Sequence, residues 1–337
     1  MTHRVILAPM EGLADAPMRD ILTRIGGIDR CVSEFIRVTD GPLNRGTIRR
    51  LVPESLSGWK TTAGVPVHPQ LLGSDPGWLA HNAALLATLG APAVDLNFGC
   101  PAKTVNRHRG GAVLLQEPDT LYRIVSAVRS ALPAQVPVTA KMRLGYSDTS
   151  QTLACASALA SAGAAEIAVH ARTKEQGYKP PADWEWLARV RETVSVPVVA
   201  NGDIIDLESY QRIIEISGCD QVMIGRGLVS CPDLARRIQQ RVQGAGTQQV
   251  LSWPCLQPWM IDFYAQVRQL VVDRHVAGRL KQWLVLLAGS YPEARELFDR
   301  LRRETCPDVV QGLLKQGWGG AAQGLAAVPS GAGPVTC

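Results

Sequence analysis

The sequence lacks the features that mark membrane-spanning and exported proteins. Its uninterrupted apolar runs are short, for example Trp283 to Ala288, whereas a membrane helix needs about 20 consecutive apolar residues. Only six apolar residues precede Glu11, and no small-residue cleavage site follows them. We therefore expect a cytoplasmic protein that has no membrane partner.

Cysteine motifs are missing as well. The 8 cysteines are scattered and form no CxxC pair or His/Cys cluster, which argues against structural zinc. A disulfide framework is equally unexpected in a long chain without an export signal. We therefore expect no metal, and mostly buried free thiols in a reducing compartment.

A large excess of one charge is also absent. Lys and Arg number 35 against 30 Asp and Glu, which leaves a formal net charge of +5. This small excess does not prove an anionic partner by itself, but it is compatible with one. The contents of 46% hydrophobic and 19% charged residues are ordinary for a globular protein and argue against disorder.

What is present is a regular alternation of short apolar runs and helical patterns. Each run has four to six residues, which suits a strand buried on both faces. A length of 337 residues suggests about two domains, although one α/β barrel alone can use about 250 residues. The eight runs are Val5–Met10, Cys31–Phe35, Val67–Leu72, Val94–Phe98, Val138–Met142, Glu166–His170, Val196–Ala200 and Gln221–Ile224.

Eight strand–helix units predict an α/β fold, a (β/α)8 TIM barrel over residues 1–243. A doubly wound sheet would usually show fewer units and a GxGxxG motif after the first strand, which is absent. After the barrel the apolar pattern becomes purely helical. We expect a linker at 244–258, a small C-terminal helical bundle domain at 259–317, and a disordered Gly/Ala-rich tail at 318–337.

Polar side chains follow nearly every predicted strand. In an α/β barrel the carboxyl ends of the strands carry the chemistry. Any one of these side chains could be a solvated loop residue or a helix cap, but a purely structural barrel does not need the whole set. The set comprises Glu11, Glu34, Arg37, Gln70, Asn97, Cys100, Lys141, Arg143, His170, Arg172, Asn201, Asp203 and Arg226.

The segments after the seventh and eighth predicted strands fit a phosphate site. They read Asn201-Gly202-Asp203 and Gly225-Arg226-Gly227, at the place where barrels of this type usually bind phosphate. Glycine lets backbone N–H groups approach phosphate oxygens closely, and Arg226 adds a charged donor.

Lys141 ends an otherwise apolar strand. It could extend its ammonium into solvent, but an inward-pointing ammonium needs an anionic partner, because an unpaired buried charge is very costly. A reduced flavin carries negative charge near its pyrimidine ring and would be such a partner. The amide of Gln70 could bond to the same ring as donor and acceptor.

Cys100 differs from the other cysteines because it lies between Gly99 and Pro101, just past a predicted strand. A free thiol has a pKa near 8.5, so at neutral pH it is mostly protonated and can act as a general acid. A nucleophilic role would need a depressed pKa and a nearby base. Nearby His108 and His170 leave that second role open.

These motifs together resemble the tRNA-dihydrouridine synthases. The match runs in order from about residue 5 to residue 240, and its most specific part is Asn-Phe-Gly-Cys-Pro. Glu11 in the first motif, Glu34–Arg37 and Thr305–Asp308 are most similar to the bacterial C-type subfamily, which modifies uridine-16 in the D-loop. The matching motifs are Leu7–Gly12, Asn97–Ala102, Gly110–Ala112, Lys141–Arg143, His170–Thr173 and Asn201–Asp203.

The resemblance implies an FMN-bearing barrel that reduces the 5,6-double bond of uracil in tRNA. NADPH (or NADH) would reduce FMN, flavin N5 would pass hydride to C6, and Cys100 would give a proton to C5. Asn97 and Arg143 would hold the uracil edge and a phosphate. The implied FMN contacts are Pro9, Met10, Glu11, Gln70, Lys141, His170, Asn201, Gly202, Asp203, Gly225 and Arg226.

The resemblance implies the D-loop of tRNA as partner, and local runs of basic residues support an RNA partner. Each run taken singly could be a solvated helix or loop face. Phosphate contacts need such cations, and a target base must be flipped out of its stack. The residues we expect to contact tRNA are Arg37, Asn97, Arg143, Tyr178, Arg274, His275, Arg279 and Lys281.

Two other functions compete with this hypothesis. A small-molecule FMN dehydrogenase of the dihydroorotate type shares the barrel and a cysteine beside a proline, but it needs no basic helical domain. An RNA-binding module without catalysis would have no use for Gln70, Cys100 and Lys141. We expect a monomer.

Overall fold

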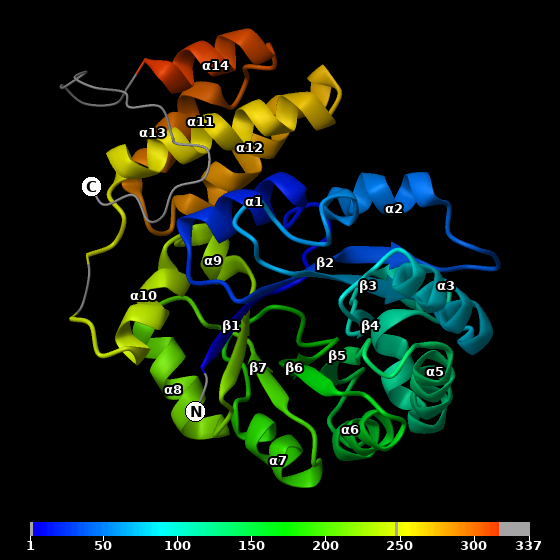
Figure 1. The fold of residues 1–337 in the computed structure, drawn as a ribbon. Coiled ribbons are helices and arrows are strands. Elements are labelled where there is room, and N and C mark those ends of the chain that lie inside the picture. The colour runs from blue at the N-terminus through cyan, green and yellow to red at the C-terminus, as the bar shows by residue number, and fades with distance from the viewer. Residues whose placement is uncertain (1–2, 247–248, 317–337) are drawn as a thin grey trace. The chain divides into compact units, whose positions relative to one another are not determined.

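The computed structural model describes residues 3–246 and 249–316 and contains a closed barrel of eight parallel strands in sequence order (Figure 1). This confirms the predicted α/β barrel, and each predicted run overlaps one strand. The strands are β1 (Arg4–Leu7), β2 (Arg30–Arg37), β3 (Val67–Leu72), β4 (Val94–Phe98), β5 (Val138–Gly145), β6 (Glu166–Thr173), β7 (Val198–Asn201) and β8 (Gln221–Ile224).

Helices follow the strands in nearly every unit, and Figure 1 shows α3 and α5–α8 around the outside of the barrel. The helical elements are α1 (Ala16–Ile25), α2 (Arg45–Leu51), η1 (Pro53–Leu56), α3 (Pro76–Thr88), α4 (Lys103–Arg107), η2 (Gly111–Gln116), α5 (Pro118–Ala131), α6 (Thr152–Ser161), α7 (Glu185–Thr193), α8 (Leu207–Ser217), α9 (Arg226–Ser230), α10 (Leu234–Val242), α11 (Trp253–Leu270), α12 (Asp273–Leu287), α13 (Pro292–Leu301) and α14 (Pro307–Lys315).

Local sequence signals set several helix ends. The Asp75 side chain accepts a hydrogen bond from the Trp78 backbone N–H at 2.7 Å and so caps α3. Asp206 and Ser209 form a reciprocal capping box at the start of α8. Gly218 ends that helix with φ +63°, a left-handed conformation that favours glycine.

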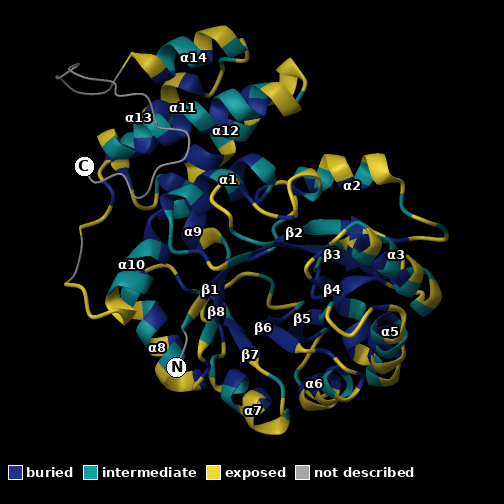
Figure 2. Ribbon diagram, viewed as in Figure 1, coloured by how far each residue is buried: buried dark blue, intermediate teal, exposed yellow. Residues whose placement is uncertain are grey.

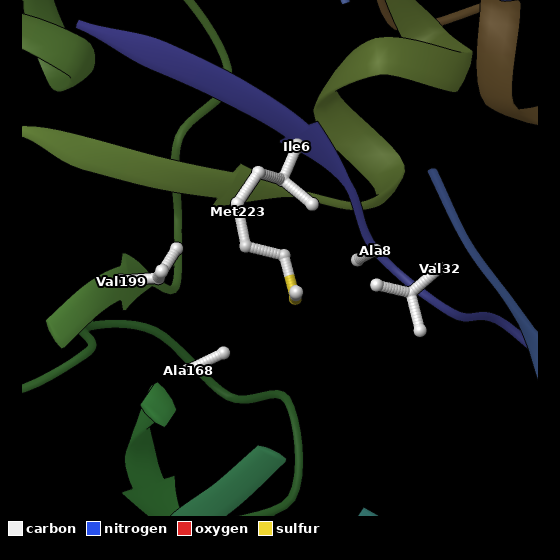
Figure 3. Close-up of a cluster of buried hydrophobic side chains, with 6 residues drawn as sticks. All are labelled: Ile6, Ala8, Val32, Ala168, Val199 and Met223. Carbon is white, nitrogen blue, oxygen red and sulfur yellow. The ribbon is translucent and has the colours of Figure 1, made fainter. Parts of the chain in front are cut away.

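One side of the barrel interior is apolar. Six buried residues from the β1 segment, β2, β6, β7 and β8 form a cluster inside the barrel (Figure 3). Residues two apart in a strand share one face, so alternate positions of these strands point inward. The cluster consists of Ile6, Ala8, Val32, Ala168, Val199 and Met223.

The other side, built by β3, β4 and β5, is polar. Gln70 and Thr139 both donate hydrogen bonds to the carboxylate of Asp95, and all three side chains are buried. Arg30 and Glu166, at the first residues of β2 and β6, form an ion pair. Buried polar groups are tolerated only when they are paired, and these are paired with one another.

The described residues form two compact units. The first comprises the residues up to Ala16 together with Ile28–Gly225, and it contains all eight strands. The second comprises Pro17–Gly27 and the residues from Arg226 onward. Helices α1, α9 and α10 thus belong to the second unit, whereas the predicted division places them in the barrel domain at 1–243.

Contacts within the second unit explain why α1 belongs there. Arg24 of α1 forms ion pairs with Asp20 of the same helix at 3.1 Å and with Asp262 of α11. Gly27 approaches α10 so closely that an added Cβ would lie 2.3 Å from the carbonyl carbon of Ala235. The pairing of Arg24 with Asp262 and the approach of Gly27 to Ala235 join residues far apart in the chain, so periodicity does not reveal them.

The core of the second unit is aromatic. The rings of Phe263 and Trp283 meet edge to face with their centroids 4.8 Å apart, and Trp283 Nε1 donates to the Val229 carbonyl at 2.9 Å. Helix α11 begins at Trp253, inside the segment predicted as a linker at 244–258. That helix therefore starts earlier than the change of apolar period suggests.

We expected no membrane partner, no metal and mostly buried free thiols. In residues 3–246 and 249–316, no helix is long and apolar enough to cross a membrane. The same residues hold no group of three or more His, Cys, Asp or Glu placed to bind a metal ion. Cys31, Cys100, Cys155, Cys219 and Cys231 are buried free thiols, whereas Cys306 is exposed. The predicted disordered tail at 318–337 lies outside the described residues.

Candidate active site

Strand register gathers the predicted site residues of the first unit at the carboxyl end of the barrel. Asn97 of β4 pairs with Lys141 of β5, and Arg143 of β5 pairs with His170 of β6. His170 in turn pairs with Asn201 of β7. The sequence places these residues up to about a hundred positions apart, and closure of the barrel makes them neighbours.

The loop after β4 holds Cys100 by its backbone. The side-chain oxygen of Asn97 accepts hydrogen bonds from the N–H groups of Gly99 and Cys100, each at 2.9 Å. The Cys100 carbonyl accepts from Asn106 Nδ2 at 2.9 Å and from the Ala112 N–H at 3.1 Å. Both backbone polar groups of Cys100 are therefore fixed, which orients its side chain.

Gly111 packs directly against this loop. Its φ is +67°, and an added Cβ would lie 2.8 Å from the Cys100 carbonyl oxygen and 3.0 Å from the Cys100 Cβ. Only glycine satisfies both the left-handed backbone and this close approach. The sequence motif Gly110-Gly111-Ala112 marks the position, but spacing alone does not show that it supports Cys100.

The Cys100 thiol lies in an apolar surrounding. It packs with Leu72, Val105 and Phe35, and the residue is 8% exposed. Burial raises the pKa of Cys100 above its ordinary value, although a backbone hydrogen bond from Ala102 opposes the shift. The thiol is therefore protonated at neutral pH, which favours a proton donor and disfavours a thiolate nucleophile.

Gln70 is completely buried next to this loop. Its Nε2 donates to Asp95 at 2.7 Å, and its Oε1 accepts from Asn97 Nδ2 at 2.7 Å. Each amide atom retains one further hydrogen-bonding position, because Nε2 carries two hydrogens and Oε1 two lone pairs. The amide thus connects the barrel interior to the Cys100 loop.

Lys141 places an ammonium among these groups. Its Nζ donates to Asn201 Oδ1 at 3.3 Å, and Asn201 Nδ2 donates to the Met223 carbonyl at 2.7 Å. Burial, together with the positive charge of Arg143, lowers the pKa of Lys141 to about 8. Within the described part of the chain Lys141 forms no ion pair, so its charge is compensated only partly.

Arg172 belongs to the polar set at the strand ends, but we predicted no contact for it. It is buried, it forms an ion pair with Asp203, and its guanidinium lies 3.3 Å from His170 Nε2. The Ala182 N–H donates to the same Asp203 carboxylate at 2.8 Å. The signal in the sequence was the spacing of two residues from His170, which puts both side chains on one face of β6.

Two glycines shape the ends of β7 and β8. At Gly202 an added Cβ would lie 3.0 Å from the Ala182 Cβ, and φ there is +136°. At Gly225 an added Cβ would lie 3.1 Å from Met10 Sδ. Side chains at these two positions would occupy the end of the barrel where the phosphate site is predicted.

Arg143 joins two loops. It is 2% exposed, and it donates to the Gly99 carbonyl at 2.9 Å and to the carbonyls of Thr173 and Gly177 at 3.0 and 2.9 Å. Its guanidinium carbon lies 5.1 Å from the centre of the Tyr178 ring. Tyr178 itself is 53% exposed and lies 5.9 Å, centre to centre, from the His170 ring.

The first βα loop supplies the remaining predicted contacts of this unit. Pro9 and Met10 are half-buried and Glu11 is exposed, and the Met10 carbonyl accepts from the N–H of Leu13 at 3.0 Å. Arg37, the last residue of β2, is exposed.

The other predicted contacts lie in the second unit. Arg226 is the first residue of α9. Arg274 and His275 are exposed on α12, and Arg279 of the same helix is half-buried. Lys281 donates to the carbonyls of Arg302 and Glu304 at 3.1 and 2.6 Å. Lys281 therefore secures the end of α13, in addition to any other role.

Comparisons with known proteins agree on one family. The model of the dihydrouridine synthase family matches residues 6–270. A tRNA-dihydrouridine(16) synthase from Aquipseudomonas alcaligenes is 55% identical over 311 residues, which cover 92% of this chain and 98% of that protein. The enzyme of the same name from Neisseria meningitidis serogroup A is 49% identical over 312 residues, covering 92% and 93%.

A solved structure shares the fold. An old yellow enzyme homologue from Zymomonas mobilis superposes with a TM-score of 0.51 at 13% sequence identity, covering 76% of this chain and 92% of that one. At this identity the likeness concerns the barrel fold alone.

Proposed function

Because this chain belongs to the dihydrouridine synthase family, we propose that it reduces the 5,6-double bond of uridine-16 in the D-loop of tRNA. The names of its relatives support the substrate and the position. The observation that carries the chemistry is Cys100, a buried and protonated thiol held at the carboxyl end of β4. We expect the enzyme to work as a monomer in the cytoplasm.

The residues at the carboxyl end of the barrel fit FMN. Among the described residues, the half-buried ammonium of Lys141 has a single hydrogen-bond partner, an amide oxygen, so an anionic ring beside it would relieve the cost of its burial. The absence of a side chain at Gly202 and Gly225 keeps the backbone bare where the predicted phosphate site lies, and an added Cβ would crowd Ala182 or Met10 there. The Lys141 ammonium would suit the flavin ring of FMN, and the two glycines would suit its phosphate end.

Further residues complete the proposed FMN site. We assign Gln70, Lys141 and His170 to the flavin ring, and Asn201, Gly202, Asp203 and Gly225 to the ribityl phosphate end, with Pro9, Met10 and Glu11 from the first loop. A contact of Arg226 with FMN stays a prediction of the resemblance. Arg172 supports this set, because its ion pair with Asp203 fixes the loop after β7. FMN, once reduced by NADPH or NADH, would supply hydride to C6 of the uracil.

Cys100 supplies the proton. Its burial keeps the thiol protonated, so it can give its hydrogen to C5 as the double bond is reduced. The loop donates hydrogen bonds to Asn97 and accepts one from Asn106, which keeps the sulfur in one place, as general acid catalysis requires. The resulting thiolate must recover a proton before the next turnover, since a buried thiolate is costly.

Asn97 and Arg143 hold the proton donor in place. Both Asn97 amide atoms and most of the Arg143 guanidinium bond to the protein itself. We therefore assign them first to holding the Cys100 loop, and a direct contact of either with the uracil edge or a phosphate stays a prediction. Tyr178, exposed beside His170, is the side chain best placed to stack on a flipped base.

Exposed cations support binding of the rest of the tRNA. In the first unit Arg37 and the three arginines of α2 are exposed (Figure 2), and none of these α2 arginines forms an ion pair with a described residue. In the second unit Arg274, His275 and Arg279 lie on α12. Phosphate contacts of this kind are independent of sequence and weaken with salt.

The test is dihydrouridine at position 16 of tRNA. We expect purified protein with FMN and NADPH to form it in unmodified tRNA, and Cys100→Ala to lower the rate by about 10²–10⁴-fold. The flavin spectrum of the variant should match that of the parent. Cys306→Ala is the matched control, because that thiol is exposed, and it should leave the rate unchanged.

Three outcomes would contradict parts of the proposal. Unchanged dihydrouridine formation by Cys100→Ala would exclude the thiol as proton donor. Loss of flavin in that variant would make Cys100 a structural residue. Oxidation of dihydroorotate without any effect on tRNA would favour the small-molecule dehydrogenase instead.

A further inference from the structure

Asp95 has no role in the site described so far, although it lies next to it. It is 2% exposed at the second residue of β4, two residues before Asn97, so both side chains point into the barrel. Its carboxylate accepts one hydrogen bond from Thr139 and one from Gln70 Nε2, the latter at 2.7 Å.

The carboxylate determines which way the neighbouring amide points. An ionised carboxylate can only accept hydrogen bonds, so Gln70 must turn its Nε2 toward Asp95. Its Oε1 then faces Asn97 and accepts from Asn97 Nδ2 at 2.7 Å. Asn97 must consequently turn its own oxygen toward the loop, where the N–H groups of Gly99 and Cys100 donate to it at 2.9 Å.

Asp95 therefore determines which group donates and which accepts in every hydrogen bond of this series. If Gln70 rotated by half a turn, its Oε1 would face a carboxylate oxygen and its Nε2 would face the NH₂ group of Asn97. Asn97 would then rotate in turn, and it would present an NH₂ group to two backbone N–H groups. Each of these arrangements sets like groups against each other in a buried place, which is costly.

We propose that Asp95 is a positioning residue for the reduction, because its carboxylate fixes a directed hydrogen-bond chain through Gln70 and Asn97 to the backbone amides of Gly99 and Cys100. The proposal rests on the proposed function, in which Cys100 gives the proton. The chain ends on the residue that performs the chemistry.

A purely structural role explains the carboxylate less well. Burying a carboxylate is costly, and burial indeed raises the pKa of Asp95, while the hydrogen bonds from Thr139 and Gln70 oppose this shift. A neutral or apolar residue would fill the same place in the barrel at lower cost. A carboxylate is useful here because it can only accept a hydrogen bond, so Gln70 must turn its NH₂ group toward it.

Three matched substitutions test this hydrogen-bond chain. Asp95→Leu keeps the branched shape of the side chain, although it is larger, and removes the acceptor, so Gln70 loses its anchor. Asp95→Asn keeps an acceptor for Gln70 if its NH₂ group turns toward the Thr139 hydroxyl, and it should restore most of the function. Thr139→Val removes the other hydrogen bond to Asp95 and leaves the chain to Asn97 intact.

The first measurement does not depend on activity. Hydrogen exchange, followed by mass spectrometry on peptides spanning residues 97–102, reports how firmly the Gly99 and Cys100 amides are held. We expect exchange at least about tenfold faster in Asp95→Leu, and within about threefold of the parent in Asp95→Asn and Thr139→Val. Equal exchange in Asp95→Leu and Thr139→Val would overturn the proposal, whether or not the protein makes dihydrouridine.

The second measurement separates the two half-reactions of the FMN-loaded enzyme. Reduction of the flavin by NADPH does not use Cys100, whereas formation of dihydrouridine does. Asp95→Leu should slow dihydrouridine formation at least about tenfold and leave flavin reduction within about threefold. A parallel fall of both rates, or loss of bound FMN, would make Asp95 a structural or cofactor residue and overturn the proposal.

Discussion

The two sides of the barrel interior differ in what they contribute to the protein. The side built by β1, β2, β6, β7 and β8 is filled by apolar side chains around Met223, whereas the side built by β3, β4 and β5 holds Gln70, Asp95, Thr139 and Lys141. Both sides occupy alternate positions of parallel strands, so geometry does not distinguish them. Apolar burial stabilises the fold, while buried polar groups cost stability and are kept for what they hold.

A barrel can bury polar groups that serve catalysis where these groups are hydrogen-bonded to one another. Gln70, Asp95 and Thr139 are not scattered, because they bond to one another across neighbouring strands, and Lys141 bonds to Asn201 of β7. Such polar groups can remain buried because these hydrogen bonds satisfy most of them. The apolar side must then supply the stability that the polar side does not.

The largest effect on stability is expected on the apolar side. Met223→Ala should lower the free energy of unfolding by about 2–5 kcal/mol, because a buried thioether chain is lost and a cavity remains. Urea denaturation measures this difference. Dihydrouridine formation per folded molecule should stay close to that of the parent, and a selective loss of activity without destabilisation would break the division between the two sides.

On the polar side, Lys141→Met is expected to raise the free energy of unfolding instead of lowering it. The pKa of Lys141 is lowered to about 8, so its charged form is disfavoured in the folded protein. Removing the ammonium should stabilise the protein without cofactor by about 1–3 kcal/mol at pH 7, while it weakens FMN binding.

The pH dependence sharpens that prediction. The unfolded chain binds a proton at Lys141 up to about pH 10.4, whereas the folded chain loses it near pH 8. The stability of the parent relative to Lys141→Met should therefore rise as the pH increases between these values. A difference that stays constant over this range would show that Lys141 is not desolvated.

A smaller effect on the free energy of unfolding is expected from His68, near the start of β3. Burial lowers the pKa of His68 to about 3, with a further contribution from the positive charge of Arg30, so the folded protein keeps this imidazole neutral. The unfolded chain takes up the proton below about pH 6.5. The parent should therefore lose up to about 1.4 kcal/mol per pH unit as the pH falls from 6.5 toward 3, relative to His68→Gln.

Denaturation curves of both proteins between pH 4 and pH 7 check this expectation. The slope is the useful quantity, because the substitution itself changes stability by an amount that does not depend on pH. Identical slopes would mean that the imidazole takes up its proton in the folded protein as it does in the unfolded chain, and that the polar side is more solvated than its burial indicates.

The barrel was predictable because its strands are buried on both faces. Parallel strands under helices form nearly continuous apolar runs, and Val67–Leu72, Val94–Phe98 and Gln221–Ile224 are predicted with the bounds that the structure shows. The position of Cys100 was predictable for the same reason. Once a run is identified as a barrel strand, its carboxyl end is the place for chemistry.

The partners of the site residues were not predictable. Arg172 meets Asp203 across 31 positions, and Gln70 meets Asp95 across 25, because of strand register rather than any local pattern. Helix α1 has the amphipathic pattern of any barrel helix, yet Arg24 pairs with Asp262 of the second unit. Periodicity shows that a face is buried, but it does not show which neighbour covers it.

The guanidinium of Arg143 has a mechanical consequence. One rigid, planar group bonds at the same time to the Gly99 carbonyl, next to the proton donor, and to the carbonyls of Thr173 and Gly177, next to the exposed Tyr178. A displacement of the Tyr178 loop must therefore stretch or carry along the bond to Gly99. Pressure on that tyrosine is transmitted through a single side chain to the loop that bears the thiol.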